Sequence, residues 1–99
     1  MKNSFQNIIN SKTPVLVDFF AEWCGPCKVL GPILKHVKDE LGDSVKIVKI
    51  DIDKNQALAQ KHQVRGVPTM LLFKGGKNVW RQSGVLQKND IINVIQSHN

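Results

Sequence analysis

The chain has 99 residues, of which 41% are hydrophobic and 22% charged, which is the composition of an ordinary globular protein. This length can bury one hydrophobic core but not two, so we expect a single domain over residues 1–99. Fourteen Lys and Arg against eight Asp and Glu give a net charge of +6, but the basic residues are scattered without interleaved aromatic side chains, which argues against nucleic-acid binding.

Two further properties bear on where the protein works. The longest apolar run is far too short to span a membrane, and residues 1–10 lack the continuous apolar stretch of a signal peptide. We therefore expect a cytoplasmic protein that does not bind membranes, unless a leader has been removed. The positive charge is explained by a solvated surface; the alternative is electrostatic steering toward acidic partner proteins, which added salt would weaken.

The N-terminal region predicts a short helix followed by a buried strand. Apolar residues recur at helical spacing in residues 5–9, with Ser4 placed to cap the helix and Pro14 to end it. Residues 15–20 are almost all apolar and rich in β-branched and aromatic side chains, which is typical of a strand buried on both faces. Asp18 interrupts this strand, and an ionisable group there is costly unless it has a partner or a task.

The two cysteines follow this strand. Cys24 and Cys27 stand at the start of a helix predicted over residues 24–41, with Gly42 at its C′ position and a kink at Gly31-Pro32. A thiol at a helix N-terminus lies near unpaired N–H groups and the positive end of the dipole, which stabilise its thiolate. A second thiol one turn away can resolve a mixed disulfide. We therefore predict that Cys24 attacks and that Cys27, expected to be more buried, resolves.

A zinc site and a structural disulfide are the alternatives for this pair. Zinc needs two further ligands, and His36, His62 and His98 show no ligand-like spacing to the cysteines. A disulfide across so short a loop restricts little of the unfolded chain and would stabilise the fold only slightly. The sequence therefore predicts a redox pair, with no metal.

The rest of the chain alternates strands with helices and ends in a hairpin. A Gly-Gly link between the last two strands predicts a tight antiparallel turn. The whole pattern predicts an α/β fold with a mixed sheet and helices on both faces. The expected strands cover residues 45–51, 69–73 and 78–83, and the expected helices cover 55–62, with Ala57 and Leu58 inward, and 88–98.

Two segments resemble one known family. Residues 17–28 are similar, nearly residue for residue, to the active-site segment of the thioredoxins, and residues 65–69 resemble the loop that carries their cis-proline. The likeness covers roughly residue 5 to the end. It implies the thioredoxin fold, here with a central mixed sheet of four strands in the order second, first, third, fourth, because the family's N-terminal edge strand has no counterpart in this sequence.

The resemblance also implies roles for residues around the cysteines. Asp18 would be the buried acid that relays a proton to or from Cys27, and Lys49, on the neighbouring strand, would lie near it. The alternatives are a cap or a buried ion pair for Asp18 and an ordinary exposed strand position for Lys49. Gly25 and Pro26, between the cysteines, resemble the reducing members of the superfamily, which implies a reducing redox poise.

A substrate groove follows from the same resemblance. Pro68 would be cis, and the backbone groups of Val67 would be free to pair with an extended substrate. The indole N–H of Trp23 needs an acceptor, for which Asp53 is the candidate. The apolar groove expected around the disulfide consists of Trp23, Gly66, Val67, Pro68, Gly84 and Val85.

The implied activity is protein disulfide reduction by thiol–disulfide exchange, as an electron carrier in cell redox homeostasis. The partners would be disulfide-bearing client proteins and a thioredoxin reductase, an NADPH-dependent flavoenzyme, because the sequence carries no nucleotide-binding fingerprint of its own. We expect a monomer without a bound cofactor. The alternatives are a binding or scaffold subunit that uses the fold alone, and an exported thiol–disulfide oxidoreductase.

Overall fold

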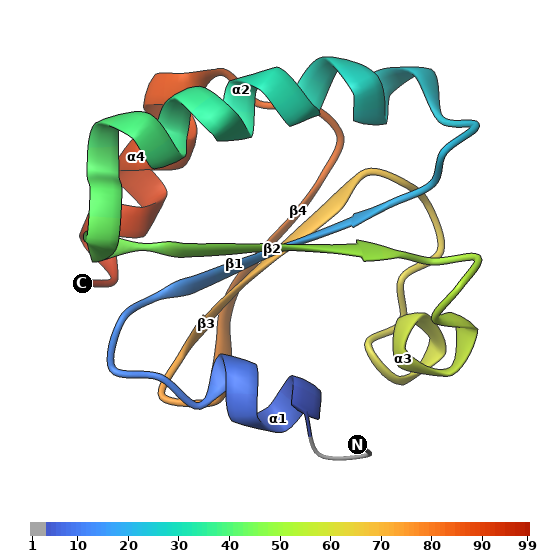
Figure 1. Cartoon of the computed structure of the whole chain (residues 1–99), viewed down its shortest axis with the longest axis horizontal. Helices are drawn as coiled ribbons and strands as arrows, with labels where there is room; N and C mark the ends of the chain where they lie inside the picture. The colour runs from blue at the N-terminus through green and yellow to red at the C-terminus, as the bar shows by residue number, and fades with distance from the viewer. Residues whose placement is uncertain (1–3) are drawn as a thin grey trace.

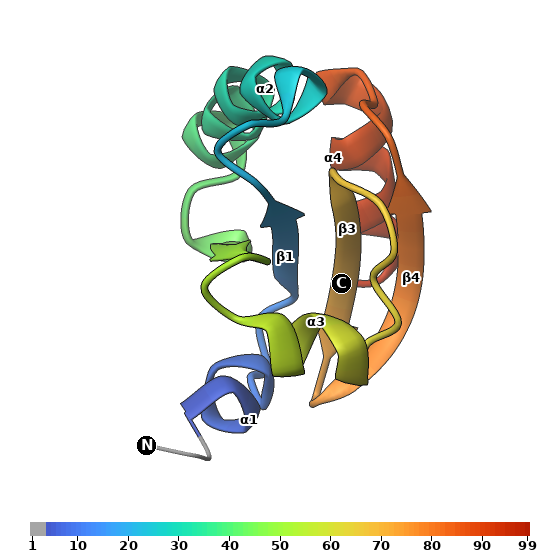
Figure 2. The ribbon, with the colours of Figure 1, turned by 90° about the vertical axis from the view of Figure 1, so that its right-hand side faces the viewer.

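The computed structural model describes residues 4–99, which form a central sheet with two helices on each face (Figures 1 and 2). Helices α2 and α4 cover one face, and the short helices α1 and α3 cover the other. None of the helices in this part of the chain is long and apolar enough to cross a membrane. The elements are α1 Ser4–Ile9, β1 Val15–Phe20, α2 Gly25–Leu41, a 3-10 turn Gly42–Ser44, β2 Lys46–Asp51, α3 Gln56–Lys61, β3 Thr69–Lys74, β4 Lys77–Ser83 and α4 Lys88–Ser97.

The sheet has the strand order β2-β1-β3-β4. Strand β1 pairs with β2 in parallel and with β3 antiparallel, and β3 pairs antiparallel with β4. This confirms the predicted mixed sheet and its spatial order. Strand β1 is central and is covered on both faces, which is why its sequence is a nearly continuous apolar run.

Alternate residues of β1 point to opposite faces of the sheet and belong to two separate cores. Leu16 packs with α2 and α4 side chains such as Leu30 and Ile95. Val17 and Phe19 pack on the other face, in a core that includes Ile9 of α1. Asp18 follows Leu16 by two positions, so its side chain faces α2 and α4, although apolar residues surround it along the strand.

The β3–β4 hairpin closes through Gly75 and Gly76. Both have positive φ, 59° and 82°, which the favoured two-residue hairpin turn requires and which glycine adopts without a steric penalty. The predicted tight Gly-Gly turn is confirmed. The turn also contacts the N-terminal region, because the Gly76 N–H donates to the Ile9 carbonyl at 3.1 Å.

Helix boundaries differ from the predictions by small shifts. Helix α1 begins at Ser4 itself, and α2 begins at Gly25 with Cys24 as its N-cap. Helix α2 includes Pro32, the position at which the sequence predicts a kink. It ends at Leu41 as predicted, and Gly42 follows with a φ of 57° and donates its N–H to the Lys38 carbonyl.

Helix α3 corrects one inward-facing prediction. Ala59 is buried and Leu58 partly buried, whereas Ala57 is exposed. The helix has six residues, too few for the apolar periodicity to show which of two alanines faces the sheet. The final orientation follows from tertiary packing, in which Leu58 contacts the core that contains Phe19.

Candidate active site

The two cysteines form a disulfide at the N-terminus of α2, with their Cα atoms 5.3 Å apart. Cys24 is the N-cap residue, and its Sγ accepts a hydrogen bond from the Cys27 backbone N–H at 3.1 Å. That donor is one of the N–H groups a helix leaves unpaired in its first turn. In the reduced protein, this N–H and the dipole of the 17-residue helix would stabilise a thiolate on Cys24.

Burial does not distinguish the two cysteines. Cys24 is 4% exposed and Cys27 is 5% exposed, so the prediction that Cys27 is more buried is wrong. The reason is a long-range contact, since Val67 packs against the cluster formed by the cysteines and Ala21 and helps to cover Cys24. What separates the two thiols is their position relative to the start of the helix.

The loop before β3 faces the disulfide. The Val67–Pro68 peptide bond is cis, as predicted, and the Val67 carbonyl oxygen lies 3.6 Å from Cys24 Sγ. Pro68 is buried, and its carbonyl accepts the Gly84 N–H at 2.9 Å. The Thr69 hydroxyl donates to the Gly66 carbonyl at 2.7 Å and so holds the other side of the loop.

The predicted substrate groove is brought together in large part. The hydrogen bonds of the loop join Gly66, Pro68 and Gly84, and Val67 touches the cysteine cluster. Trp23, next to Cys24 in the chain, is 69% exposed, and its indole N–H donates to Asp53 Oδ2 at 2.8 Å, which confirms the predicted acceptor. Val85 packs instead against the core under α2 and α4.

Asp18 is completely buried on the same side of the sheet as α2. Neither carboxylate oxygen has a hydrogen-bond partner within residues 4–99. Burial therefore raises the pKa of Asp18 to about 6, because the charged form loses its hydration, while the positive charge of Lys49 opposes this rise. A carboxyl group with this pKa can exchange a proton near neutral pH.

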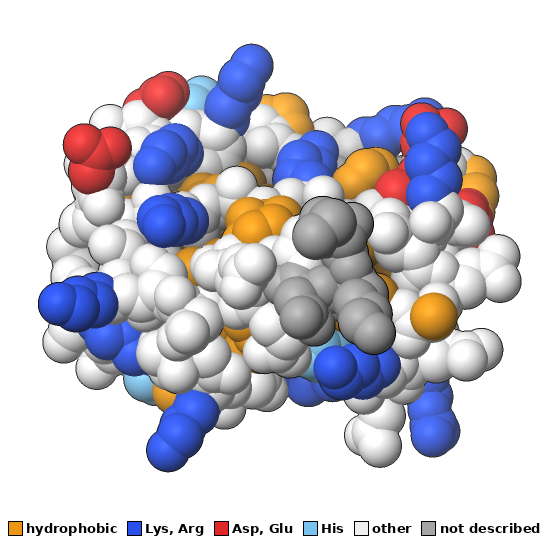
Figure 3. All heavy atoms as spheres, turned by 60° about the horizontal axis from the view of Figure 1, so that its bottom comes forward, with side chains coloured by type: hydrophobic (Ala, Val, Ile, Leu, Met, Phe, Trp, Pro, Cys, Tyr) orange, Lys and Arg blue, Asp and Glu red, His pale blue; other side chains and the backbone are white. Residues whose placement is uncertain are grey.

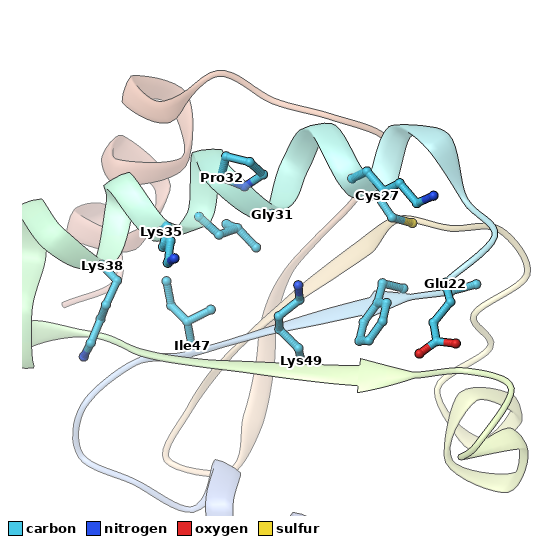
Figure 4. Close-up of a pocket in the computed structure, with 12 residues that line it drawn as sticks. Glu22, Cys27, Gly31, Pro32, Lys35, Lys38, Ile47 and Lys49 are labelled. Atoms are coloured by element: carbon cyan, nitrogen blue, oxygen red, sulfur yellow. The ribbon is translucent and has the colours of Figure 1, made fainter.

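Lys49 is the residue opposite Asp18 in the β1–β2 register. It is exposed, as an ordinary strand lysine would be, yet its Nζ lies 4.9 Å from the centroid of the Phe20 ring. This is cation–π geometry. In Figure 4 the Lys49 side chain rises from β2 toward α2, in the hollow that Cys27 also lines.

This hollow, which we name the α2–β2 groove, was not predicted. It has a volume of about 900 Å³ and lies between α2 and the edge strand β2 (Figure 4). Its sequence signal is the spacing of Lys28, Lys35 and Lys38, which recur at helical intervals and share one side of α2. The net charge of the whole chain does not reveal this local pattern.

The described part of the chain gathers no group of three or more His, Cys, Asp or Glu side chains that could hold a metal ion. His62 lies among aromatic rings on the opposite face of the sheet from Asp18 and α2. The chemistry available at the site is therefore that of the two sulfur atoms, with Asp18 as a buried acid on the same face of the sheet.

Comparisons with known proteins agree with this geometry. The thioredoxin family profile matches residues 1–97. Thioredoxin of Haemophilus influenzae is 45% identical over 91 residues, covering 92% of this chain and 85% of that protein. Thioredoxin Y, chloroplastic, of Oryza sativa subsp. japonica is 44% identical over 96 residues, which are 96% of this chain, but this chain spans only 57% of that protein's length.

Among solved structures, a mutant thioredoxin from Halobacterium salinarum superposes with a TM-score of 0.88 and 36% sequence identity. The match covers 96% of this chain and 82% of that one. Fold, cysteine pair and sequence likeness agree over nearly the whole length. The chain belongs to the thioredoxin family of protein disulfide oxidoreductases, and the Cys24–Cys27 pair is its redox-active dithiol–disulfide.

Proposed function

We propose that this protein reduces disulfide bonds in client proteins and is returned to its dithiol form by an NADPH-dependent thioredoxin reductase. The observation that carries the proposal is the hydrogen bond from the Cys27 N–H to Cys24 Sγ at the start of α2, beside the Val67 carbonyl. This environment favours a thiolate on Cys24 with a neighbouring backbone able to hold a substrate. Thiols kept reduced in this way suit a reducing compartment such as the cytoplasm.

The reaction consists of two exchanges. The Cys24 thiolate attacks one sulfur of the client disulfide, forming a mixed disulfide and releasing the other client sulfur as a thiolate. The Cys27 thiolate then attacks Cys24 Sγ, which forms the Cys24–Cys27 disulfide and releases the second client thiolate. Two electrons have moved from this protein to the client, whose two thiolates take up protons.

Asp18 is suited to accept the proton of Cys27 before the second exchange. A carboxylate with a pKa of about 6 is ionised above that pH, yet remains a stronger base than an ordinary aspartate. Lys49, exposed and opposite Asp18 in the register, favours the ionised carboxylate through its positive charge. In this proposal Asp18 acts as a general base, and the positive charge of Lys49 favours the ionised form of the Asp18 carboxyl group.

Client segments are proposed to bind in an extended form beside the disulfide. The backbone of Val67 would pair with the client chain as a short added strand, and the exposed ring of Trp23 offers an apolar docking face. The indole is fixed by its bond to Asp53, so little side-chain freedom is lost when a client binds.

The proposal is tested by insulin reduction with NADPH and a bacterial thioredoxin reductase, together with trapping of intermediates. Wild type should reduce insulin catalytically, and Cys27→Ser should accumulate mixed disulfides through Cys24. Cys24→Ser is the matched control and should form none. Trapping through Cys27 instead would reverse the assigned roles. A variant with both cysteines replaced by serine that keeps partner binding and its cellular role would show that the fold acts as a scaffold.

A further inference from the structure

Strand β2 is an edge strand whose outer side is open. It has a single neighbour, β1, and Figures 1 and 2 show no strand or helix of residues 4–99 along its other side. The Lys46 N–H donates to the Pro14 carbonyl and the Ile52 N–H to the Phe20 carbonyl, both at 2.9 Å. Because alternate residues of a parallel strand bond to the same neighbour, the backbone groups of Ile47 and Lys49 point away from β1.

This open edge borders the α2–β2 groove. The side chains of Ile47 and Lys49 are two positions apart, so both lie on the face of β2 that looks toward α2, and both line the groove. Phe20 and Leu34 add apolar surface, and Gly31 and Pro32 of α2 also line the groove. A segment laid along β2 would therefore find backbone donors and acceptors and, for alternate side chains, a hollow under α2.

The charge of the groove specifies what such a segment carries. Four lysines line it against one acidic residue, Glu22, which also lies 4.0 Å from Lys54. Lys38 donates to the Gly42 and Val45 carbonyls, whereas Lys35 has no hydrogen bond or ion pair within the described residues. Figure 3 shows Lys and Arg side chains spread over the whole view, with the acidic side chains toward its upper left and upper right. The four lining lysines are Lys28, Lys35, Lys38 and Lys49.

The same charges argue against a second copy of this chain as the occupant. An edge-to-edge pair through β2 would place the exposed Lys46 and Lys49 of both copies along one seam, and each copy carries a net charge of +6. Like charges close together across paired strands destabilise the pairing. A segment with negative charge gains attraction at the position where a second copy would meet repulsion.

We propose that the open edge of β2 and the α2–β2 groove together bind an extended, acidic segment of a partner protein as an added strand. Backbone hydrogen bonds to Ile47 and Lys49 hold the segment, and acidic side chains face the lysines of α2. The groove does not include the loop of Val67 and Pro68, although Cys27 lines one end of it.

The probe is a short synthetic peptide of alternating valine and glutamate, added to the oxidised protein and followed by fluorescence anisotropy and amide NMR. Binding should shift the amide signals of Ile47 and Lys49 and slow their hydrogen exchange, and added salt should weaken it. A peptide of alternating valine and lysine should not bind. An oligothymidylate that binds the same residues as tightly would indicate a general polyanion site and overturn the proposal.

Two pairs of variants separate charge from strand pairing. Lys35→Glu should weaken peptide binding roughly fivefold, whereas Lys77→Glu, which changes net charge equally at the β3–β4 hairpin, should not. Ile47→Pro removes an outward N–H that β1 does not use and should abolish binding, whereas Ile47→Val should retain it. Thermal melts and insulin reduction verify that all four variants are folded and active.

The outcomes are decisive in either direction. No binding by wild type would mean that Lys46 and Lys49 only protect the edge against aggregation. Signals confined to Trp23 and Val67 would place the peptide at the redox site and also overturn the proposal. Either result leaves insulin reduction intact, so the failure of this inference is distinguishable from the failure of the proposed disulfide reductase.

Discussion

Each face of the sheet covers one ionisable side chain whose buried polar atoms lack a hydrogen-bond partner among residues 4–99. On the α2 and α4 face, both carboxylate oxygens of Asp18 are in this state, and on the α1 and α3 face, Nε2 of His62 is. Loss of hydration shifts each pKa toward the neutral form, upward for Asp18 and downward for His62. Desolvation alone therefore does not identify a functional group.

The surroundings of the two groups differ. The His62 ring packs against Phe5 and Phe73, with centroids 5.3 and 5.7 Å away, as an aromatic member of that core. Positive charges of Lys61 and Arg81 also lower the pKa of His62, and Arg81 holds its backbone by donating to its carbonyl at 2.6 Å. Asp18 instead has a cation of opposite sign nearby, and its side of the sheet carries the disulfide. The contrast predicts a chemical role for Asp18 and a packing role for His62.

The largest expected effect is that of Asp18→Asn. A carboxyl whose folded pKa is about 6 and whose ordinary value is 3.8 binds more protons in the folded state, so stability falls as pH rises between these values. Asparagine removes this penalty, and the variant should be more stable by about 3 kcal/mol above pH 6 and unchanged below pH 3.8. Urea melts across this pH range measure it.

The same variant should reduce insulin roughly tenfold more slowly or worse, because Cys27 loses its proton acceptor. Asp39→Asn is the matched control, since Asp39 is exposed on α2, and it should change neither stability nor rate. An Asp18→Asn protein that is less stable at neutral pH and fully active would show that Asp18 is a structural ion-pair partner of Lys49.

Many of the features around Asp18 and the cysteines could be predicted from the sequence. The apolar run of β1 fixed the central strand, and one carboxyl inside it indicated a special group. The resemblance around Cys24 implied the loop of Pro68, and the need of the Trp23 indole for an acceptor led to Asp53. In these cases a local pattern or one unsatisfied donor carried the information.

The rest depends on contacts between distant segments. The equal burial of the cysteines comes from Val67, forty residues or more along the chain, which no local pattern encodes. The aromatic surroundings of His62 combine Phe5, Phe19 and Phe73 from three elements. The α2–β2 groove brings together lysines of α2 and of β2, two elements whose neighbourhood no local pattern encodes.

A smaller effect is expected from His62→Phe. The pKa of His62 is lowered in the folded state, so the unfolded chain binds more protons, and wild-type stability should decrease as pH falls through about 6.5. Phenylalanine keeps the aromatic packing and removes this dependence, so the variant should lose less stability in acid. Insulin reduction should be unchanged at pH 7. A large loss of activity would contradict the packing role and make the two faces functionally alike.

The smallest expected effect is that of Lys49→Met, which tests the feature that separates Asp18 from His62. The lysine charge lowers the pKa of Asp18, so its removal should raise that pKa above about 6. The direction for stability follows: the variant is unchanged below pH 3.8 and slightly less stable at pH 8, where the buried carboxylate is ionised without its counter-charge. The shift is small because Lys49 is exposed and water screens its charge.

An NMR pH titration of the Asp18 carboxyl signal measures this shift directly. Lys46→Met is the matched control, because Lys46 is on the same strand as Lys49 but lies opposite Val15 of β1, not opposite Asp18. If the pKa of Asp18 does not rise in Lys49→Met, the opposite charge does not tune Asp18, and only its place on the face of the disulfide distinguishes it from His62.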